Sequence, residues 1–317
     1  MSRAPATARL PGLDAARGLA VLAMFAYHFI WDLGYFRYVD PAFPYTPGFK
    51  AFGHAIAASF LFVAGAVLVL AHGDGMRWRS FARRLAVLTG AALLVSAGTY
   101  AAFPKSWVFF GILHCIAAAS LLALPFLRAS WPAPLAAALA AAAAPMVLSS
   151  PVFDAPWLQW VGLSTVAPLT NDYRPLLPWS GALLLGVAAA RLRRASAPRA
   201  RPARAPAGFR GASVLGFLGR HSLALYLLHQ PAFFALLYGA ALVLPPSAPD
   251  GTADFVAACA TRCGAAGGAA DFCRASCLCT AQEAARRLLE NSADEAERAR
   301  RLDEAARDCA ARARRRP

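Results

Sequence analysis

An apolar stretch from Leu13 to Phe36 is long enough to cross a lipid bilayer, yet it carries four ionisable side chains. These are Asp14, Arg17, His28 and Asp32, and their spacings of three, eleven and four residues place them close to one face of a helix. Ionisable residues in membrane spans usually face a bundle interior or a wet cavity, because exposure to lipid is costly. A single ionisable residue would be explained equally well without a site, as an arginine that reaches a lipid headgroup or a histidine bonded to a backbone carbonyl. Four on one face favour a functional site.

The composition of the whole chain is typical of a membrane protein. Its 317 residues are 58% hydrophobic and only 15% charged, with a mean hydropathy of +0.46, which excludes a soluble enzyme of this length. We therefore predict an all-α fold, a polytopic bundle of about seven membrane helices followed by a Cys-rich helical tail. The expected spans are Leu13–Phe36, Gly53–Ala71, Leu85–Phe103, Trp107–Leu127, Trp131–Leu148, Leu176–Leu192 and Val214–Leu244.

The net charge of +15 belongs almost entirely to the membrane part. Up to Ala248 the chain has 20 Lys and Arg against 6 Asp and Glu, and from Pro249 onward it has 12 against 11. Most of the excess lies in loops, which is the positive-inside pattern and argues against nucleic acid as a partner. A cytoplasmic N-terminus places fourteen basic residues inside and only four outside: Arg37, Lys50, Lys105 and Arg174. We expect a multi-pass protein of a bacterial inner membrane, with no cleavable signal and a periplasmic tail.

Two connecting segments have distinct compositions. Residues 191–211 are rich in Arg, Pro and Ala without periodicity, which predicts a cytoplasmic linker near anionic lipid. The outer segment 149–178 carries Trp157, Trp160, Asp172 and Arg174, and Trp179 follows it directly. Tryptophans at a membrane boundary usually anchor the interface, but aromatic rings beside an aspartate and an arginine also suit a sugar. The sequence does not separate these alternatives, and Asp172, Arg174 and Trp179 are candidate substrate-binding residues.

Three of the six histidines, His28, His114 and His229, fall at a similar depth in the predicted topology. A lone membrane histidine more often donates a hydrogen bond between helices than acts as a catalyst. Three at one level, with Asp32 available to orient His28, favour a shared cavity in which an imidazole moves a proton near neutral pH. His114, His229 and the outer His54 are further candidate substrate-binding residues. No metal-ligand spacing, Ser-His-Asp order or phosphate-binding loop appears, and no metal is expected.

The tail changes character abruptly and holds six of the seven cysteines. Cys259 and Cys263, then Cys273 and Cys277, form two C-x3-C pairs around a glycine-rich turn, followed by Cys279 and Cys309. Such pairs on two short helices would staple an antiparallel hairpin in an oxidising compartment. Metal binding is the alternative if the tail lies inside, but the absence of histidine favours disulfides. We predict two domains, 1–248 in the membrane and 249–317, a helical hairpin plus a charged helix.

Five motifs occur in the same order as in a known family. They are LDAARGLAVLAMFAYHFIWDL, FLFVAGAVLVLA, FFGILHCIAAASLL, DYRPLLPWSGALLLGV and LGRHSLALYLLHQP. Over about residues 9–240 the chain resembles the bacterial members of the heparan-alpha-glucosaminide N-acetyltransferase catalytic-domain family, part of a wider group of membrane acyltransferases. The resemblance implies transfer of an acetyl group from cytoplasmic acetyl-CoA to a sugar or amino-sugar acceptor of the cell envelope, on nitrogen or oxygen.

The resemblance also implies roles for particular residues. Members of the wider group use an arginine near the start of the first span and a histidine further along it, which here are Arg17 and His28. We expect His28, Arg17, Asp32 and Asp14 to be catalytic, with His28 as base or nucleophile. The phosphates of acetyl-CoA are expected to meet basic residues on the inner side, because a guanidinium binds phosphate bidentately. These are Arg17, Arg77, Arg79, Arg83 and the adjacent Arg84.

Other interpretations of the same residues stay open. The arginines of the inner loops are explained equally well by the positive-inside rule alone, without a role in binding acetyl-CoA. A proton-coupled transporter would use the same buried His, Arg and Asp cluster, and an envelope protein could use its spans only as an anchor for the tail. The expected partners are the lipid bilayer and the glycan or amino-sugar acceptor, with a homodimer left open.

Overall fold

The chain divides into two compact units in the computed structural model, which describes residues 11–196, 210–244, 251–290 and 295–314. One unit is formed by Met1–Tyr35 and Val39–Ala240, and the other by Phe36–Tyr38 and Ala241–Pro317. The predicted domain boundary at residues 248 and 249 and positions 197–209 of the predicted linker lie outside the described residues. The predicted all-α fold is confirmed, since no strand occurs in the described part of the chain.

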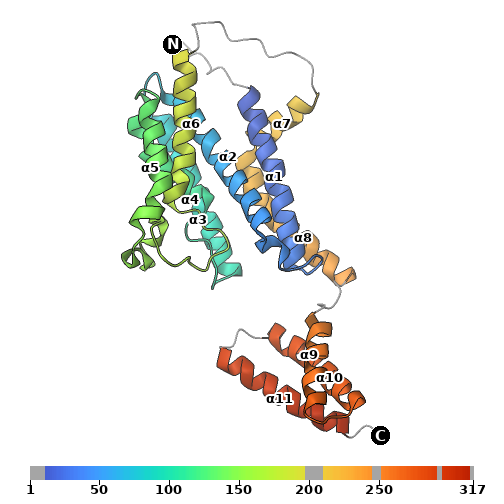
Figure 1. The fold of residues 1–317 in the computed structure, drawn as a ribbon. Helices are drawn as coiled ribbons and strands as arrows, with labels where there is room; N and C mark the ends of the chain where they lie inside the picture. The colour runs from blue at the N-terminus through green and yellow to red at the C-terminus, as the bar shows by residue number, and fades with distance from the viewer. Residues whose placement is uncertain (1–10, 197–209, 245–250, 291–294, 315–317) are drawn as a thin grey trace. The chain divides into compact units, whose positions relative to one another are not determined.

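The first unit is a bundle of eight helices within the described ranges (Figure 1). They are α1 (Pro11–Tyr35), α2 (Pro47–His72), α3 (Trp78–Ala102), α4 (Ile112–Leu122), α5 (Pro132–Leu148), α6 (Leu176–Ser196), α7 (Arg210–Arg220) and α8 (Ser222–Val243). The helices α1, α2 and α3 run alternately in opposite directions (Figure 1). The end of α1 therefore meets the start of α2, and the end of α2 meets the start of α3.

Four helices of the described chain are long and apolar enough to cross a membrane. They cover Gly12–Tyr35, Pro47–His72, Trp78–Ala102 and Ser222–Val243, and they correspond to the first, second, third and last predicted spans. The segments predicted as the fourth and fifth spans form shorter helices of 11 and 17 residues. The predicted sixth span is α6, whose backbone is extended at Leu177 and whose last turn is basic. The predicted last span is two helices, because the chain breaks between Arg220 and Ser222.

Glycines let two pairs of helices touch backbone to backbone. A Cβ atom at Gly65 of α2 would overlap the carbonyl of Leu183 on α6, and one at Gly186 of α6 would overlap the carbonyl of Phe62. Likewise, a Cβ atom at Gly219 of α7 would overlap the carbonyl of Asp14 on α1. Small residues at contacts are how membrane helices gain close packing. The contact between α1 and α7 brings the start of the first span against the turn that precedes α8.

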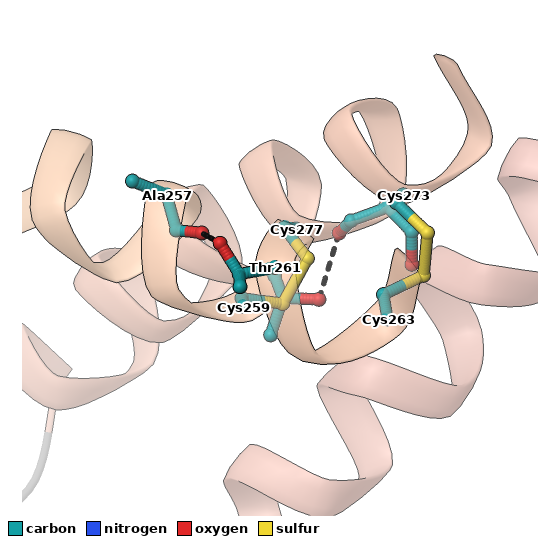
Figure 2. Close-up of a disulfide and its surroundings, with 8 residues drawn as sticks. Ala257, Cys259, Thr261, Cys263, Cys273 and Cys277 are labelled. Atoms are coloured by element: carbon teal, nitrogen blue, oxygen red, sulfur yellow. Dashed lines mark hydrogen bonds between the residues drawn. A yellow bond between two sulfur atoms is a disulfide. The ribbon is translucent and has the colours of Figure 1, made fainter. Parts of the chain in front are cut away.

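The second unit contains α9 (Gly251–Ala265), α10 (Ala270–Glu290) and α11 (Glu295–Arg314). The disulfides Cys259–Cys277 and Cys263–Cys273 join α9 to α10 across a turn in which Gly267 has a φ of +88° (Figure 2). A third disulfide, Cys279–Cys309, joins α10 to α11. The predicted disulfides are thus confirmed, and Cys115 of the first unit is a buried free thiol. Three cross-links compensate for the small apolar core of so short a segment.

Candidate active site

A cavity of about 1470 Å³ lies inside the first unit. Its walls come from α1, α2, α3, the start of α4, the end of α7, α8 and the loop before α6. Four arginines, Arg17, Arg83, Arg84 and Arg220, line it near the start of α1, the start of α3 and the end of α7. Lys50, His54, Asp172 and Arg174 line it near the start of α2 and the loop before α6. Because α1 and α2 run in opposite directions, these two groups belong to opposite ends of one cavity.

His28 and His229 line the cavity and meet in it, from α1 and α8. Their ring centroids are 4.8 Å apart. Phe25 stacks on the His229 ring at 5.6 Å, and the Nδ1 atom of His229 lies 2.7 Å from the carbonyl oxygen of Tyr226. The Nε2 atom of His229 is buried and has no hydrogen-bond partner among the described residues. Arg17 lines the same cavity as His28, in keeping with the predicted common face of α1.

The carboxylate of Asp32 bonds to Gln230, and no hydrogen bond joins it to His28 in the described part of the chain. The Asp32 side chain is fully buried, and its Oδ1 atom accepts a hydrogen bond of 2.6 Å from the Gln230 side chain of α8. Its Oδ2 atom has no partner in the described part of the chain. The bond therefore ties α1 to α8 beside the two histidines. Asp14, the fourth residue of the predicted face, is absent from the described cavity lining.

The arginines expected to bind acetyl-CoA divide into two groups. Arg17, Arg83 and Arg84 line the cavity, and the Nη1 atom of Arg84 is buried without a partner among the described residues. Arg77 and Arg79 are exposed and are not among the described lining residues. The Arg77 guanidinium donates instead to the carbonyl of Ala71 at the end of α2. Arg77 directly precedes α3 and Arg79 lies in its first turn, whereas Arg83 and Arg84 lie about one turn further along the helix.

The other end of the cavity combines charged and aromatic groups. Arg174 lies 3.7 Å from Asp172, whose Oδ2 atom also accepts a hydrogen bond from the backbone amide of Ile112. The guanidinium of Arg174 is 5.0 Å from the ring of Trp179, and that ring is 5.4 Å from the ring of His54. Trp179 therefore supports the lining residues from behind, since it is not itself among the described residues of the wall.

His114 is separate from the other two histidines predicted at its depth. Its Nε2 atom lies 3.4 Å from the hydroxyl of Ser96, and its Nδ1 atom accepts a bond from the amide of Gly111. The described cavity lining does not include it. His114 has the role of a hydrogen-bonding residue between α3 and α4, which was the alternative for a lone membrane histidine.

The loop between α5 and α6 is held by one carboxylate. Asp154 accepts hydrogen bonds from the hydroxyls of Thr165 and Ser164 and from the amide of Thr165, at 2.6 to 2.7 Å. These bonds lower the pKa of the Asp154 carboxyl to about 2. A lowered pKa means that the ionised carboxylate stabilises the loop at neutral pH, and that this contribution is lost as the pH falls through about 2. Burial raises the pKa of the Tyr173 hydroxyl, which donates to the carbonyl of Gln159.

Several lining residues were not predicted as functional. Lys50 and Arg220 were assigned only to topology or to a span end, and Gln230 and Tyr226 were not singled out. Gln230 and Tyr226 could have been found from the sequence YLLHQP. It places the Gln230 amide directly after His229 and the Tyr226 carbonyl about one helical turn before it. The described residues contain no group of three or more His, Cys, Asp or Glu side chains arranged to hold a metal ion.

The fold and cavity define a helical membrane protein with a chamber among its helices that is lined by apolar residues and carries charged groups at both ends. A family model, Heparan-alpha-glucosaminide N-acetyltransferase, catalytic, matches residues 9–231, and the chain belongs to this family of membrane acetyltransferases. The match covers every arginine and histidine among the described residues that line the cavity. No curated protein and no solved structure matches the chain.

Proposed function

We propose that this protein transfers an acetyl group from cytoplasmic acetyl-CoA to a sugar or amino-sugar acceptor of the bacterial cell envelope. One observation carries the proposal: a single cavity joins a group of arginines to two histidines and then to a charged and aromatic end. The donor would enter at the arginines, react at the histidines and meet an acceptor from the other end. Membership of an acetyltransferase family supports acetyl transfer as the reaction.

The arginine end suits the phosphates of the donor. Arg17 and Arg84, which are partly buried, and the exposed Arg83 offer several N–H donors, and the unpartnered Nη1 atom of Arg84 suits an oxyanion. Arg17 and His28 are eleven residues apart on α1, which is about 16 Å of helix rise. That length lets a phosphate group lie at the arginines while the thioester of a long donor reaches the histidines.

The chemistry of the transfer requires a proton acceptor or a nucleophile beside the thioester. His28 would serve in either role, since it lines the cavity and lies within one turn of the fixed Asp32. At the other end, Asp172 and Arg174 would hydrogen-bond sugar hydroxyls, with His54 and Trp179 beside them. We further propose that the N-terminus is cytoplasmic and that the tail, whose cysteines are paired, is periplasmic.

The test uses the purified full-length protein in lipid nanodiscs, with radiolabelled acetyl-CoA and a bacterial envelope glycan extract as acceptor. We expect acetyl incorporation that falls about 100-fold or more in His28→Ala, the usual size of a lost acid–base group. His221→Ala is the control, because His221 is exposed and is not among the described lining residues.

Two results would contradict the proposal. One is the absence of acetyl incorporation by the wild-type protein, and the other is full incorporation by His28→Ala. Uptake of solute into liposomes without release of free CoA would favour the transporter instead.

A further inference from the structure

The hydrogen bond at Nδ1 of His229 fixes where this ring keeps its lone pair. A carbonyl oxygen only accepts hydrogen bonds, so the 2.7 Å contact with Tyr226 requires a proton on Nδ1. In the neutral ring the Nε2 atom is then unprotonated and basic. This atom is buried and has no partner among the described residues, in a side chain that is only 6% exposed and lines the cavity.

Among the described histidines, His229 alone combines these properties. His221 also contacts a backbone carbonyl through Nδ1, but it is exposed and outside the described lining. The Nδ1 atoms of His72 and His114 accept bonds from backbone amides, so their lone pairs are occupied. His54 is exposed at the end of the cavity. His28 lines the cavity, and no backbone hydrogen bond of the described chain sets the tautomer of its ring.

We infer that His229, rather than His28, is the general base of the acetyl transfer, with its tautomer set by the carbonyl of Tyr226, which leaves to His28 the role of nucleophile or of a contact to the thioester. This assignment rests on the proposed function. The acceptor's O–H or N–H gives its proton to Nε2 of His229 while its oxygen or nitrogen bonds to the acetyl carbon. The C–S bond breaks, and the electron pair leaves with the CoA sulfur. The proton on Nε2 then passes to that thiolate, which yields free CoA thiol and restores the neutral ring.

The same atom serves a route through an acetyl-histidine. If a nitrogen of His28 attacks the acetyl carbon, the N–H proton of His28 passes to Nε2 of His229 and from there to the leaving thiolate. When the acetyl group moves on, the acceptor's proton passes to Nε2 of His229 and from there to the His28 nitrogen whose bond to the acetyl carbon breaks, which restores both neutral rings. Ring centroids 4.8 Å apart place the two imidazoles within reach of such a transfer.

The position of His229 is fixed from three sides. The Tyr226 carbonyl holds Nδ1, the Phe25 ring stacks on one face, and the bond between Gln230 and Asp32 ties the next residue to α1. Asp32 and Gln230 are therefore positioning residues, which act through the placement of the ring. A preorganised base needs no rearrangement at the moment of reaction.

The experiment combines a tautomer measurement with an activity measurement on the full-length protein in nanodiscs. Nitrogen NMR of the protein labelled at its histidines, with His229→Asn to assign the signals, is expected to show a protonated Nδ1 and a bare Nε2 for His229. Acetyl incorporation from radiolabelled acetyl-CoA into envelope glycan extract is expected to fall about 100-fold in His229→Asn. Asparagine keeps an N–H donor for the Tyr226 carbonyl, so the loss would come from the missing lone pair and not from lost packing.

Rescue and control variants separate the base from a structural role. Added imidazole is expected to restore about a tenth or more of the wild-type rate to His229→Ala. The rate of His221→Ala is expected to stay within about twofold of wild type, because substitutions of exposed residues usually have small effects. A bare Nδ1, or a wild-type rate in His229→Asn, overturns the assignment while acetyl transfer by the wild-type protein still stands. No transfer by the wild-type protein overturns the proposed function and the assignment with it.

Discussion

Arg84 places a guanidinium group in an apolar helix, α3, and forms no ion pair with a carboxylate of the described residues. Its Nη1 atom is buried and has no partner among the described residues, and its charge is repelled by that of Arg17. Two like charges in a partly buried place are unfavourable unless an anion joins them. The proposed phosphate ligand would supply that anion, and the cavity beside both residues has room for it.

We therefore predict that Arg84→Gln raises the KM for acetyl-CoA about tenfold or more, with a smaller change in kcat. A hydrogen bond to a charged group contributes roughly 1.5–3 kcal/mol, and each 1.4 kcal/mol is about a factor of ten in binding. Initial rates measured against acetyl-CoA concentration check this. Arg79→Gln is the matched control on the same helix, because Arg79 is exposed and outside the described lining. An equal rise in KM for both variants would contradict a specific contact at Arg84.

The helices α2 and α6 depend on close contact of their backbones. A Cβ atom at Gly186 would overlap the carbonyl of Phe62, and the side chains around this contact, including Leu61, Leu183 and Val187, are fully buried. A methyl group there can be accommodated only if the two helices move apart. The contact lies outside the described cavity lining, so its effect is on stability and not on binding.

Gly186→Ala is expected to destabilise the first unit by about 1–3 kcal/mol, the usual cost of overpacking. The midpoint of thermal unfolding in detergent measures the change. Gly90→Ala in α3 is the control, since a Cβ atom at Gly90 meets nothing within 4 Å. There, alanine should be neutral or stabilising, because glycine costs roughly 0.8–1.0 kcal/mol in a helix interior. A lower midpoint for Gly90→Ala than for Gly186→Ala would show that the close contact does not limit stability.

Hydropathy was enough to predict the elements that cross a membrane and not enough to predict where they break. The first predicted span has nearly the extent of α1, whereas α2 and α3 begin six and seven residues before the predicted spans, because the helices continue beyond the apolar run that would lie in lipid. The break between α7 and α8 was missed, since the predicted span was drawn through Arg220, His221 and Ser222 to join the apolar residues on either side. What separates the two helices in space is the packing of Gly219 against Asp14, a contact between residues 205 positions apart.

The residues of the candidate site that lie on a single helix could be predicted from their spacing in the sequence. The spacing of Arg17 and His28 placed both on the face of α1 that lines the cavity. The similar depth of His28 and His229 indicated a shared cavity, but their direct ring contact was not predictable, because it depends on how α8 packs on α1. For the same reason Asp32 was assigned to its neighbour on α1, whereas its carboxylate bonds to Gln230 on α8. Side-chain pairs between distant helices have no periodic signature in a single sequence.

The chain as a whole combines a unit with a cavity and a unit fixed by disulfides. Every described residue that lines the cavity precedes Ala241, and every disulfide follows it. The cross-links close loops of 18, 10 and 30 residues in sequence separation, and such cross-links stabilise mainly by restricting the unfolded chain. Reduction should therefore act on the tail alone.

We predict that a reducing agent makes the tail of the full-length protein sensitive to trypsin while acetyl transfer stays within about twofold of its initial rate. Loss of a native disulfide from a small domain typically costs about 2–5 kcal/mol, which is enough to open α10 and α11 to cleavage at their many arginines. The double variant Cys279→Ser with Cys309→Ser should lose protection of α11 first, because only this disulfide joins it to α10. Cys115→Ala is the control, since it removes the one cysteine that forms no disulfide. Loss of transfer on reduction in both the wild-type protein and Cys115→Ala would show that the acetyl-transfer site depends on the folded tail.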